Sequence, residues 1–367
     1  MTAELIPNPT QPHSSRPNPN AIDGGLIIEG FMNQENRFVG TEDSDLIIGG
    51  NLNDAIAGGK GNDIIYGGKG EDCLFGGLGD DLFYGGKGND TIFGEEGNNT
   101  LFGDEGDDLV YDGSGDDRIY GGKGNDTIYA GEGNNTLSGN DGNDLTSGGK
   151  GDDIIHGGQG DDTIYGGEGN NILSGDKGDD LIYGGIGNDT IYGVEGNNTV
   201  FGGPGNNLIF GGKGDDVIHS GRGDNTVYGG QGNDRIFAEK GNDLLTGGKG
   251  SDTFSLVSGD PDKESFSIQE WFGLDTITDF TVGEDRIELD ADIFDMLGGA
   301  GNLADSEFTT IANFFDPNNP TNTGGANLVY NSTSGVLYYI DGNGQAIPIL
   351  HLGEGLDDLD SDSFDLI

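Results

Sequence analysis

An oxygen-bearing side chain returns every nine residues along most of this chain. Counted from Gly40, the sixth residue of each nonapeptide is Asp in 18 of 24 copies and Asn in the other 6. Carboxylate oxygens, together with backbone carbonyls, suit Ca²⁺, which takes about six to eight oxygen ligands. We therefore expect the metal ligands to be the aspartates of this row, which are Asp45, Asp54, Asp63, Asp72, Asp81, Asp90, Asp108, Asp117, Asp126, Asp144, Asp153, Asp162, Asp180, Asp189, Asp216, Asp234, Asp243 and Asp252.

The sequence offers little to softer metals. Zinc and copper sites need grouped thiolate or imidazole ligands. Cys73 is the only cysteine, and the four histidines are scattered. A single cysteine also leaves no partner for an internal disulfide.

The aspartates are carried by a repeat that runs from Gly40 to Ser255 without insertion or deletion. Its pattern is Gly-Gly-x-Gly-x-Asp-x-U-x, where U is a large apolar residue. Glycine fills position 4 in 22 of 24 copies and position 1 in 20 of 24, which indicates φ > 0 or a close backbone approach in a tight turn. Position 8 is Ile, Leu, Val or Phe in every copy except that of Thr146. The x-U-x triplet predicts a very short strand with its centre inward.

This nonapeptide resembles the calcium-binding repeat of RTX (repeat-in-toxin, or haemolysin-type) proteins. The resemblance implies an all-β fold, a right-handed parallel β-roll (a β-solenoid) with two repeats in each coil and about 12 coils. It also implies that each calcium lies between two stacked turns and is held by the position-6 Asp of both turns and by backbone carbonyls. Repeat n then stacks on repeat n+2, so the odd-numbered repeats form one row of turns and the even-numbered repeats another. We call these the odd turns and the even turns.

The two rows differ in composition. Among the even turns only Asn198 interrupts the Asp row. An Asn oxygen carries no charge, so the sequence predicts weaker calcium sites at the Asn positions. The alternative is that an Asn turn closes itself with local hydrogen bonds and needs no ion. The odd turns contain the other five, Asn99, Asn135, Asn171, Asn207 and Asn225.

The charge of the chain is extreme. Its formal net charge is −50, from 66 acidic and 16 basic residues. This balance excludes nucleic acid and anionic membrane surfaces as electrostatic partners. Without metal, repulsion among so many acidic side chains opposes a compact fold. We expect calcium to drive folding because the ligands come together only in the folded state. No apolar run of 18 residues is present, so no membrane-spanning helix is expected.

The residues before the repeats differ from them in composition. Residues 1–20 are rich in Pro and Asn and have no hydrophobic core, which indicates a disordered lead and not a secretory signal peptide. Residues 21–39 contain several large apolar side chains and are expected to form an N-terminal cap. The calcium-binding roll itself is assigned to residues 40–255.

After residue 255 the nine-residue register stops, glycine becomes rarer and phenylalanine becomes more frequent. Residues 256–367 are expected to form a small β-rich cap, because the last coil would otherwise offer an open sheet edge. Residues 275–280 and 283–289 resemble the strand-rich segment that closes many RTX rolls. Residues 328–331 and 336–339 have the appearance of a hairpin around Ser334 and Gly335.

The acidic and apolar end of the chain, residues 363–367, is similar to the uncleaved tail that type I secretion systems read. The alternative is that this segment is only the last strand of the cap. With the resemblance to RTX proteins, the tail predicts a secreted, extracellular protein whose partners include calcium and the type I secretion machinery.

No catalytic signature accompanies the repeats. The motifs His-Glu-x-x-His and Gly-x-Ser-x-Gly are both missing, and the repeats begin at residue 40, which leaves no room upstream for the enzymes that RTX rolls often carry. We therefore expect a calcium-binding roll with a structural, surface or matrix role and no enzymatic activity. One alternative is a secreted polysaccharide-modifying or hydrolytic enzyme with its chemistry in residues 256–367.

A glycan-binding adhesin is the other alternative, with an extracellular polysaccharide or a cell surface as its partner. Its binding surface would be the aromatic side chains at position 9, such as Tyr66, Tyr84, Phe75 and Phe93. The same ladders would equally serve as cross-strand pairs that stiffen the sheets.

Overall fold

The structure of the chain is a computed structural model. It describes residues 25–256, 273–291, 293, 294, 297, 301–311, 317 and 323–367. The predicted lead, residues 1–20, and the first four residues of the predicted N-terminal cap lie outside the described residues. The chain divides into two compact units, residues 1–185 and 186–367, and each is described by itself.

Each repeat contributes one strand, as β5 (Ile64–Lys69) illustrates. It covers positions 7 to 9 of one repeat and positions 1 to 3 of the next, and burial alternates along it. The strand has six residues where the sequence predicted three. The difference arises because the parallel ladder between coils continues through the glycines, so that Gly68 pairs with Gly86. The side of the strand that faces inward carries Ile65 and Gly67.

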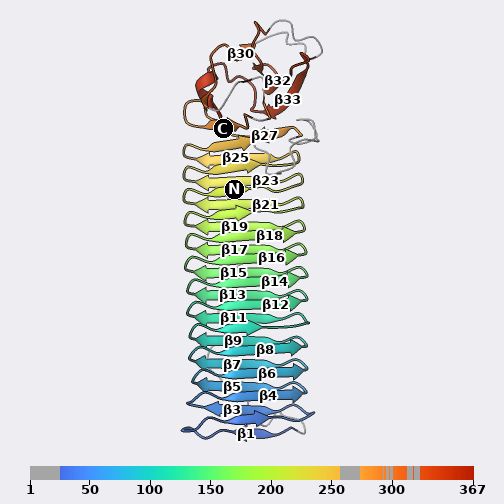
Figure 1. Cartoon of the computed structure of the whole chain (residues 1–367), viewed down its shortest axis with the longest axis vertical. Coiled ribbons are helices and arrows are strands. Elements are labelled where there is room, and N and C mark those ends of the chain that lie inside the picture. The colour runs from blue at the N-terminus through green and yellow to red at the C-terminus, as the bar shows by residue number, and fades with distance from the viewer. Residues whose placement is uncertain are drawn as a thin grey trace. The chain divides into compact units, whose positions relative to one another are not determined.

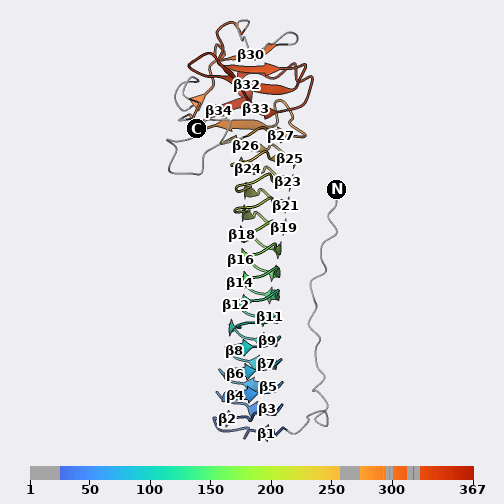
Figure 2. The same cartoon turned by 90° about the vertical axis from the view of Figure 1, so that its right-hand side faces the viewer.

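Successive strands of the first unit alternate between two parallel sheets, and each strand pairs in register with the strand two places along the chain (Figure 1). Figure 2 shows β5, β7 and β9 on one side and β4, β6 and β8 on the other. The first sheet holds β1 (Ile27–Glu29), β3 (Leu46–Gly50), β5, β7 (Leu82–Lys87), β9 (Thr100–Glu105), β11 (Arg118–Lys123), β13 (Thr136–Asp141), β15 (Ile154–Gln159) and β17 (Ile172–Lys177); the second holds β2 (Arg37–Val39), β4 (Ala55–Lys60), β6 (Cys73–Leu78), β8 (Thr91–Glu96), β10 (Leu109–Tyr111), β12 (Thr127–Glu132), β14 (Leu145–Lys150), β16 (Thr163–Glu168) and β18 (Leu181–Ile186).

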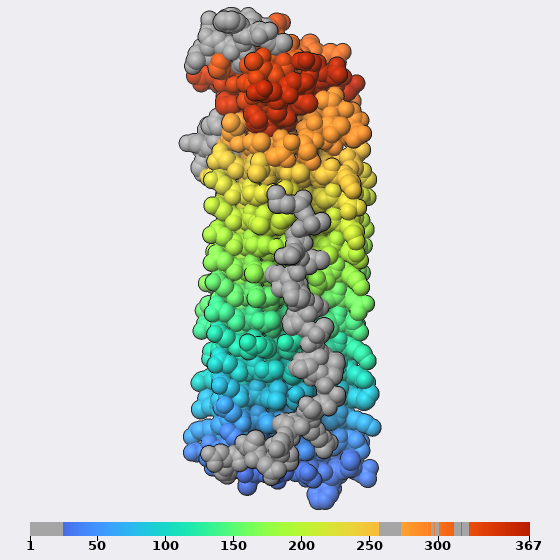
Figure 3. Space-filling view, turned by 180° about the vertical axis from the view of Figure 1, so that it is seen from behind, coloured from blue at the N-terminus to red at the C-terminus, as the bar shows by residue number. Residues whose placement is uncertain are grey.

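This arrangement is an all-β parallel β-solenoid, and it confirms the predicted fold class. The space-filling view shows its coils as stacked bands through the first unit (Figure 3). The position-8 side chains of both sheets meet between the sheets and are buried, as Ile65 and Ile128 illustrate. Burial of each such side chain contributes about 1.5–3 kcal/mol. Among the described residues no helix has the length and apolar character needed to cross a membrane.

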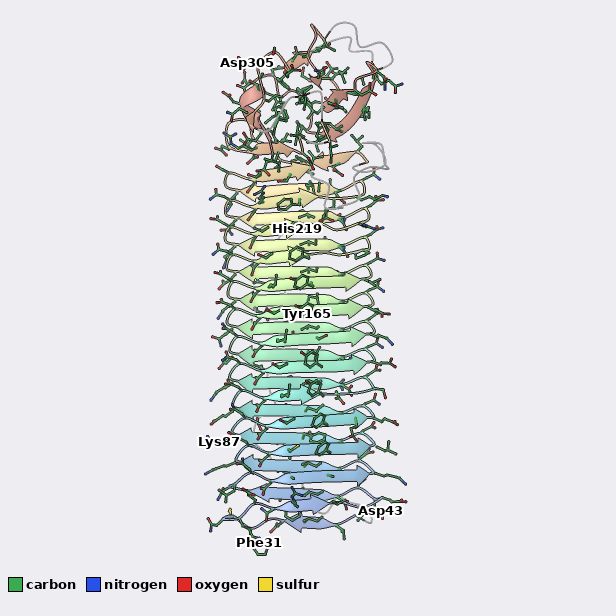
Figure 4. The ribbon with its side chains drawn as sticks, viewed as in Figure 1. Phe31, Asp43, Lys87, Tyr165, His219 and Asp305 are labelled. Carbon is green, nitrogen blue, oxygen red and sulfur yellow. The ribbon has the colours of Figure 1, made fainter. Side chains whose placement is uncertain are left out.

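Aromatic side chains at position 9 stack along the outer faces of the sheets. The ring centroids of Tyr66 and Tyr84 are 4.8 Å apart with an interplanar angle of 5°, and those of Tyr84 and Phe102 are 5.1 Å apart at 10°. Tyr165, on the other sheet, lies on the face between the two rows of turns. Lys87 projects from one row of turns and Asp43 from the other (Figure 4). Each interior ring has both faces against its neighbours, which supports the stiffening interpretation, because a stacked sugar needs a free ring face.

Residues 25–39 extend the solenoid of the first unit by one coil. Strand β1 pairs in parallel with β3, and β2 pairs in parallel with β4. The backbone N–H of Asn36 donates to Asp54 Oδ1 at 2.6 Å. Asn36 stands nine residues before Asp45, so the register of the repeat reaches back into this segment although its glycines do not.

The second unit contains a solenoid of the same kind. Its first eight complete strands follow the repeat, and β27 and β28 then add a coil by pairing in parallel with β25 and β26. This coil contains the predicted segments 275–280 and 283–289. The strands are β19 (Thr190–Glu195), β20 (Thr199–Phe201), β21 (Leu208–Lys213), β22 (Val217–His219), β23 (Thr226–Gln231), β24 (Arg235–Ala238), β25 (Leu244–Lys249), β26 (Thr253–Leu256), β27 (Asp275–Ile277) and β28 (Arg286–Leu289).

The remaining strands of the second unit cover its last coil. The predicted hairpin is confirmed, because β31 and β32 are antiparallel with Asn331 opposite Val336. Strand β33 pairs with β27, and β34 pairs with β28. The side chain of Phe364 in β34 is buried, so the end of the chain is a packed strand. These elements are β29 (Gly301–Asn302), β30 (Phe308–Ile311), β31 (Leu328–Asn331), β32 (Val336–Ile340), β33 (Ala346–His351), the 3₁₀ helix η4 (Ser361–Ser363) and β34 (Phe364–Leu366).

Candidate metal sites

All 18 aspartates at position 6 are at most 3% exposed. One carboxylate oxygen of such an Asp accepts the backbone N–H of the position-6 residue one coil earlier. Asp63 Oδ1 accepts the N–H of Asp45 at 2.7 Å, and Asp126 Oδ1 accepts that of Asp108 at 2.7 Å. These bonds fix the carboxylates in two rows, one at the odd turns and one at the even turns.

The second oxygen of these carboxylates faces away from that N–H. Leaving a buried acceptor without a partner costs about 1–3 kcal/mol, and more when it is charged. Such a row therefore needs a compensating positive group. In the described part of the chain, Oδ2 is buried and has no hydrogen-bond partner in Asp54, Asp63, Asp72, Asp81, Asp90, Asp108, Asp117, Asp126, Asp144, Asp153, Asp162 and Asp234.

Except at Asp117, whose repeat has Asp112 at position 1, a backbone oxygen meets these carboxylates beside the position-1 glycine. A Cβ atom on Gly121 would lie 2.3 Å from Asp126 Oδ2 and 2.8 Å from the carbonyl oxygen of Gly139, one coil further on. We call this meeting point the cradle. A carboxylate oxygen and a carbonyl oxygen that converge in this way are of the ligand types that Ca²⁺ takes. Equivalent contacts at 2.2–2.8 Å occur at Gly49, Gly58, Gly67, Gly76, Gly85, Gly103, Gly139, Gly148, Gly157, Gly211 and Gly229.

The glycines of the repeat therefore serve two purposes. Position-2 and position-4 glycines have left-handed backbones, as in Gly59 with φ 118° and Gly61 with φ 104°. Position-1 glycines are needed for a different reason, because a side-chain atom would occupy the cradle. The sequence indicated both purposes without assigning them to positions.

Burial shifts the protonation of the row. It raises the pKa of Asp63 to about 6, that of Asp108 to about 7 and that of Asp126 to about 8. Desolvation is the largest cause in each case. The accepted N–H opposes it, and neighbouring carboxylates add to it. A carboxyl with so high a pKa needs either a proton or a nearby cation at neutral pH.

The donor set fits calcium. Among the described residues no three His, Cys, Asp or Glu side chains gather at one point, so a cation would depend on one or two carboxylates and on backbone carbonyls. Such all-oxygen sets are the ligands that Ca²⁺ prefers. When bound, calcium supplies the positive charge that the buried Oδ2 atoms lack.

Comparison with known families identifies the repeat. The family model of the RTX calcium-binding nonapeptide repeat, in sets of four copies, matches overlapping segments of the chain from residue 48 to residue 260. The chain belongs to the RTX calcium-binding repeat family. Its repeats bind calcium at multiple sites. No curated protein matches the chain. The matched segments are 48–83, 75–110, 111–145, 138–173, 165–200, 192–227 and 228–260.

In this RTX solenoid, two of the aspartates predicted as ligands differ from the twelve above because their Oδ2 atoms accept hydrogen bonds. Asp45 Oδ2 accepts the N–H of Thr41 at 2.6 Å, and Asp243 Oδ2 accepts the hydroxyl of Ser220 at 3.0 Å. The structure thus places all the predicted residues in the two rows, but these two carboxylates have both oxygens in hydrogen bonds.

Sequence reasoning missed a second polar row, at position 5 of the RTX repeat. Asn or Asp occupies this position in 21 of 24 copies, which was the available signal. The N–H of Asp80 donates to Asn62 Oδ1 at 3.0 Å, and the N–H of Asn98 donates to Asp80 Oδ1 at 2.8 Å. Here the side chain accepts from the following coil, the reverse of position 6, so each turn is tied to the turn on either side.

The position-6 rows also continue beyond the RTX repeats. The N–H of Asp243 donates to Asp275 Oδ1 at 2.8 Å, and that of Asp252 donates to Asp285 Oδ1 at 2.9 Å. The spacing is 32 and 33 residues instead of 18, because residues 257–272 intervene. The interrupted spacing hides Asp275 and Asp285 from a reading based on a nine-residue period.

Filling one cradle tests the assignment of the RTX ligands. We expect Gly121→Ala to lower the calcium bound per folded chain by one ion and the free energy of unfolding by about 1–3 kcal/mol, because the new Cβ overpacks the cradle of Asp126. Calcium on the gel-filtered protein would be measured by atomic emission.

The matched control is Gly166→Ala. Its Cβ would also press on a carbonyl oxygen, that of Gly184 at 2.2 Å, but the neighbouring position-6 side chain is Asn171 and not an Asp. It should lose stability and keep its calcium. An unchanged calcium count in Gly121→Ala would contradict the assignment of the cradle.

Proposed function

We propose that this chain is a secreted RTX protein that folds on calcium outside the cell and then serves a structural role at a surface or in a matrix. The 18 position-6 aspartates would be its calcium ligands. The observation that carries the proposal is the row of buried Oδ2 atoms beside backbone carbonyls, since a fold built on such atoms depends on cations that are plentiful outside cells.

The packing of the last strand supports the proposal that the chain is secreted first and folds afterwards. Residues 364–366 form β34, with Phe364 buried against the last coil. A transporter that reads the tail would have to read it before this strand packs. An acidic chain without calcium would keep the tail accessible, because its charges oppose compaction.

A structural role is favoured over an enzymatic one. Only the RTX repeat family matches the chain, with no catalytic domain beside it. The stacked rings at position 9, such as Tyr84 between Tyr66 and Phe102, stiffen the sheets and support a rigid scaffold.

Export is tested in a bacterial host that carries a type I secretion system. We expect the full chain in the medium and a loss of at least about tenfold when residues 363–367 are removed, since the transporter would read that segment. Immunoblots of medium and cells provide the measurement.

The control is Asp126→Asn, which keeps the tail and should be exported like the unchanged protein. The shortened protein, purified from cells, is also given calcium, so that a folding defect is separated from an export defect. Equal export of the full chain and of the chain without residues 363–367 would contradict a secretion role for the tail.

A further inference from the structure

The Asn residues at position 6 differ from the aspartates in how their side chains are oriented. Each turn's position-6 side chain receives a backbone N–H from the coil before it, and only an oxygen can accept it. Asn171 Oδ1 accepts the N–H of Asp153 at 3.0 Å, and Asn207 Oδ1 accepts that of Asp189 at 2.9 Å. The single amide oxygen is therefore used, and the NH₂ group must face the cradle.

The NH₂ group of these Asn residues stands where Oδ2 stands in an Asp turn. A Cβ atom on Gly166 would lie 2.8 Å from Asn171 Nδ2 and 2.2 Å from the carbonyl oxygen of Gly184. Asn171 Nδ2 donates to that carbonyl at 3.4 Å and to the carbonyl of Gly169 at 3.3 Å. A donor hydrogen now occupies the direction from which a cation would approach the carbonyl oxygens.

The amide groups of three other odd Asn turns are also used in hydrogen bonds, and that of Asn99 donates to Asp112 Oδ1 at 2.9 Å. Asn207 Nδ2 donates to the carbonyl of Ser220 at 3.4 Å, and Asn135 Nδ2 donates to that of Gly148 at 3.5 Å. Asn225 Nδ2 donates to the carbonyl of Gly223 at 2.8 Å. An amide NH₂ has no lone pair to offer a metal, so the substitution removes a ligand and adds a repulsive group.

A second and independent observation concerns position 1. Four repeats carry a side chain there, and all four are odd-numbered. Ala130 is fully buried, and Ser220 donates its hydroxyl to Asp243 Oδ2 at 3.0 Å. Each of these side chains puts a Cβ where the cradle would be, but that of Asp112 also brings a buried carboxylate whose Oδ2 has no hydrogen-bond partner in the described part of the chain, so its turn is set apart from the other three. The four residues are Asp112, Ala130, Ser220 and Ala238.

We propose that the Asn turns, and the turns with Ala or Ser at position 1, hold no calcium, and that hydrogen bonds or the added side chain close them instead. Calcium then lines the even turns almost continuously and only part of the odd row. This inference rests on the proposal that Asp turns bind calcium, and it replaces the weaker sites that the sequence predicted at Asn positions. It also removes Asp243, whose repeat has Ala238 at position 1, from the 18 proposed ligands.

The test counts calcium ions on folded protein after equilibrium dialysis, using calcium as the probe, with circular dichroism to confirm folding. Asn171→Asp should bind one more ion than the unchanged chain, because Gly166 leaves the cradle open. Asn135→Asp should bind no more, because Ala130 fills the cradle, and the pair Ala130→Gly with Asn135→Asp should gain one. Asp126→Asn should bind one fewer.

The outcomes separate this inference from the proposed function. A higher affinity without a higher count in Asn171→Asp would mean that Asn171 already holds calcium, which overturns the inference and leaves the proposed function intact. If the protein without any substitution binds no calcium, the proposed function itself is overturned. If Asn171→Asp does not fold, Asn207→Asp provides the same test, since Gly202 leaves its cradle open.

Discussion

Excess EDTA should abolish most of the β-sheet circular dichroism of this protein, and added calcium should restore it. The twelve buried position-6 Oδ2 atoms named above have no hydrogen-bond partner in the described part of the chain. At about 1–3 kcal/mol for each uncompensated acceptor, their removal from water outweighs the roughly 5–15 kcal/mol by which a domain is stable. Glycine-rich turns add a large entropic cost of ordering. Without cations the solenoid should unfold.

Magnesium is the control for this experiment. It demands a near-octahedral shell and gives up its waters reluctantly, so an equal concentration should restore little of the signal. An unchanged β spectrum in EDTA would contradict the dependence of the fold on calcium.

Without metal, acid should replace calcium in part. We expect the metal-free chain to gain β-sheet signal when the pH is lowered from about 8 to about 4.5. Burial raises the pKa of Asp90 and Asp162 to about 8 and that of Asp81 and Asp234 to about 7, from 3.8. The folded state thus binds more protons than the unfolded state between pH 4 and pH 8, so the free energy of unfolding falls as the pH rises through this range.

Two further measurements isolate the cause of this pH dependence. Sodium chloride at about 1 M screens general repulsion among exposed charges, and it should restore much less structure at pH 8 than acid does. With saturating calcium the dependence should reverse, because protons compete with the metal for the same carboxylates. A metal-free chain that stays equally unfolded at pH 4.5 would contradict the role assigned to the buried row.

The unbroken nine-residue period, together with the two repeats per coil that the resemblance to RTX proteins implies, predicted the solenoid and the two rows of aspartates. It did not predict that strands extend through Gly67 and Gly68, since glycine is a poor strand residue and the ladder between coils overrides that preference. Nor did it assign a role to Asn62 and the rest of position 5, whose contacts lie 18 residues away.

The orientation of the Asn amides was also out of reach of the sequence. Whether an Asn weakens or closes a turn depends on which backbone group already uses its oxygen, as the N–H of Asp153 does for Asn171. The coil of Asp275 and Asp285 escaped for a simpler reason, because an intervening segment breaks the period on which the prediction depends.

Calcium binding at the Asp turns and folding of the solenoid should be one process. Calorimetric titration of the metal-free protein with calcium at neutral pH, with circular dichroism followed on the same samples, tests it most directly. We expect many ions bound per chain, with β-sheet signal rising in step with the heat of binding and both saturating together. Full β-sheet signal before any calcium is bound, or calcium bound without a gain in structure, would contradict it.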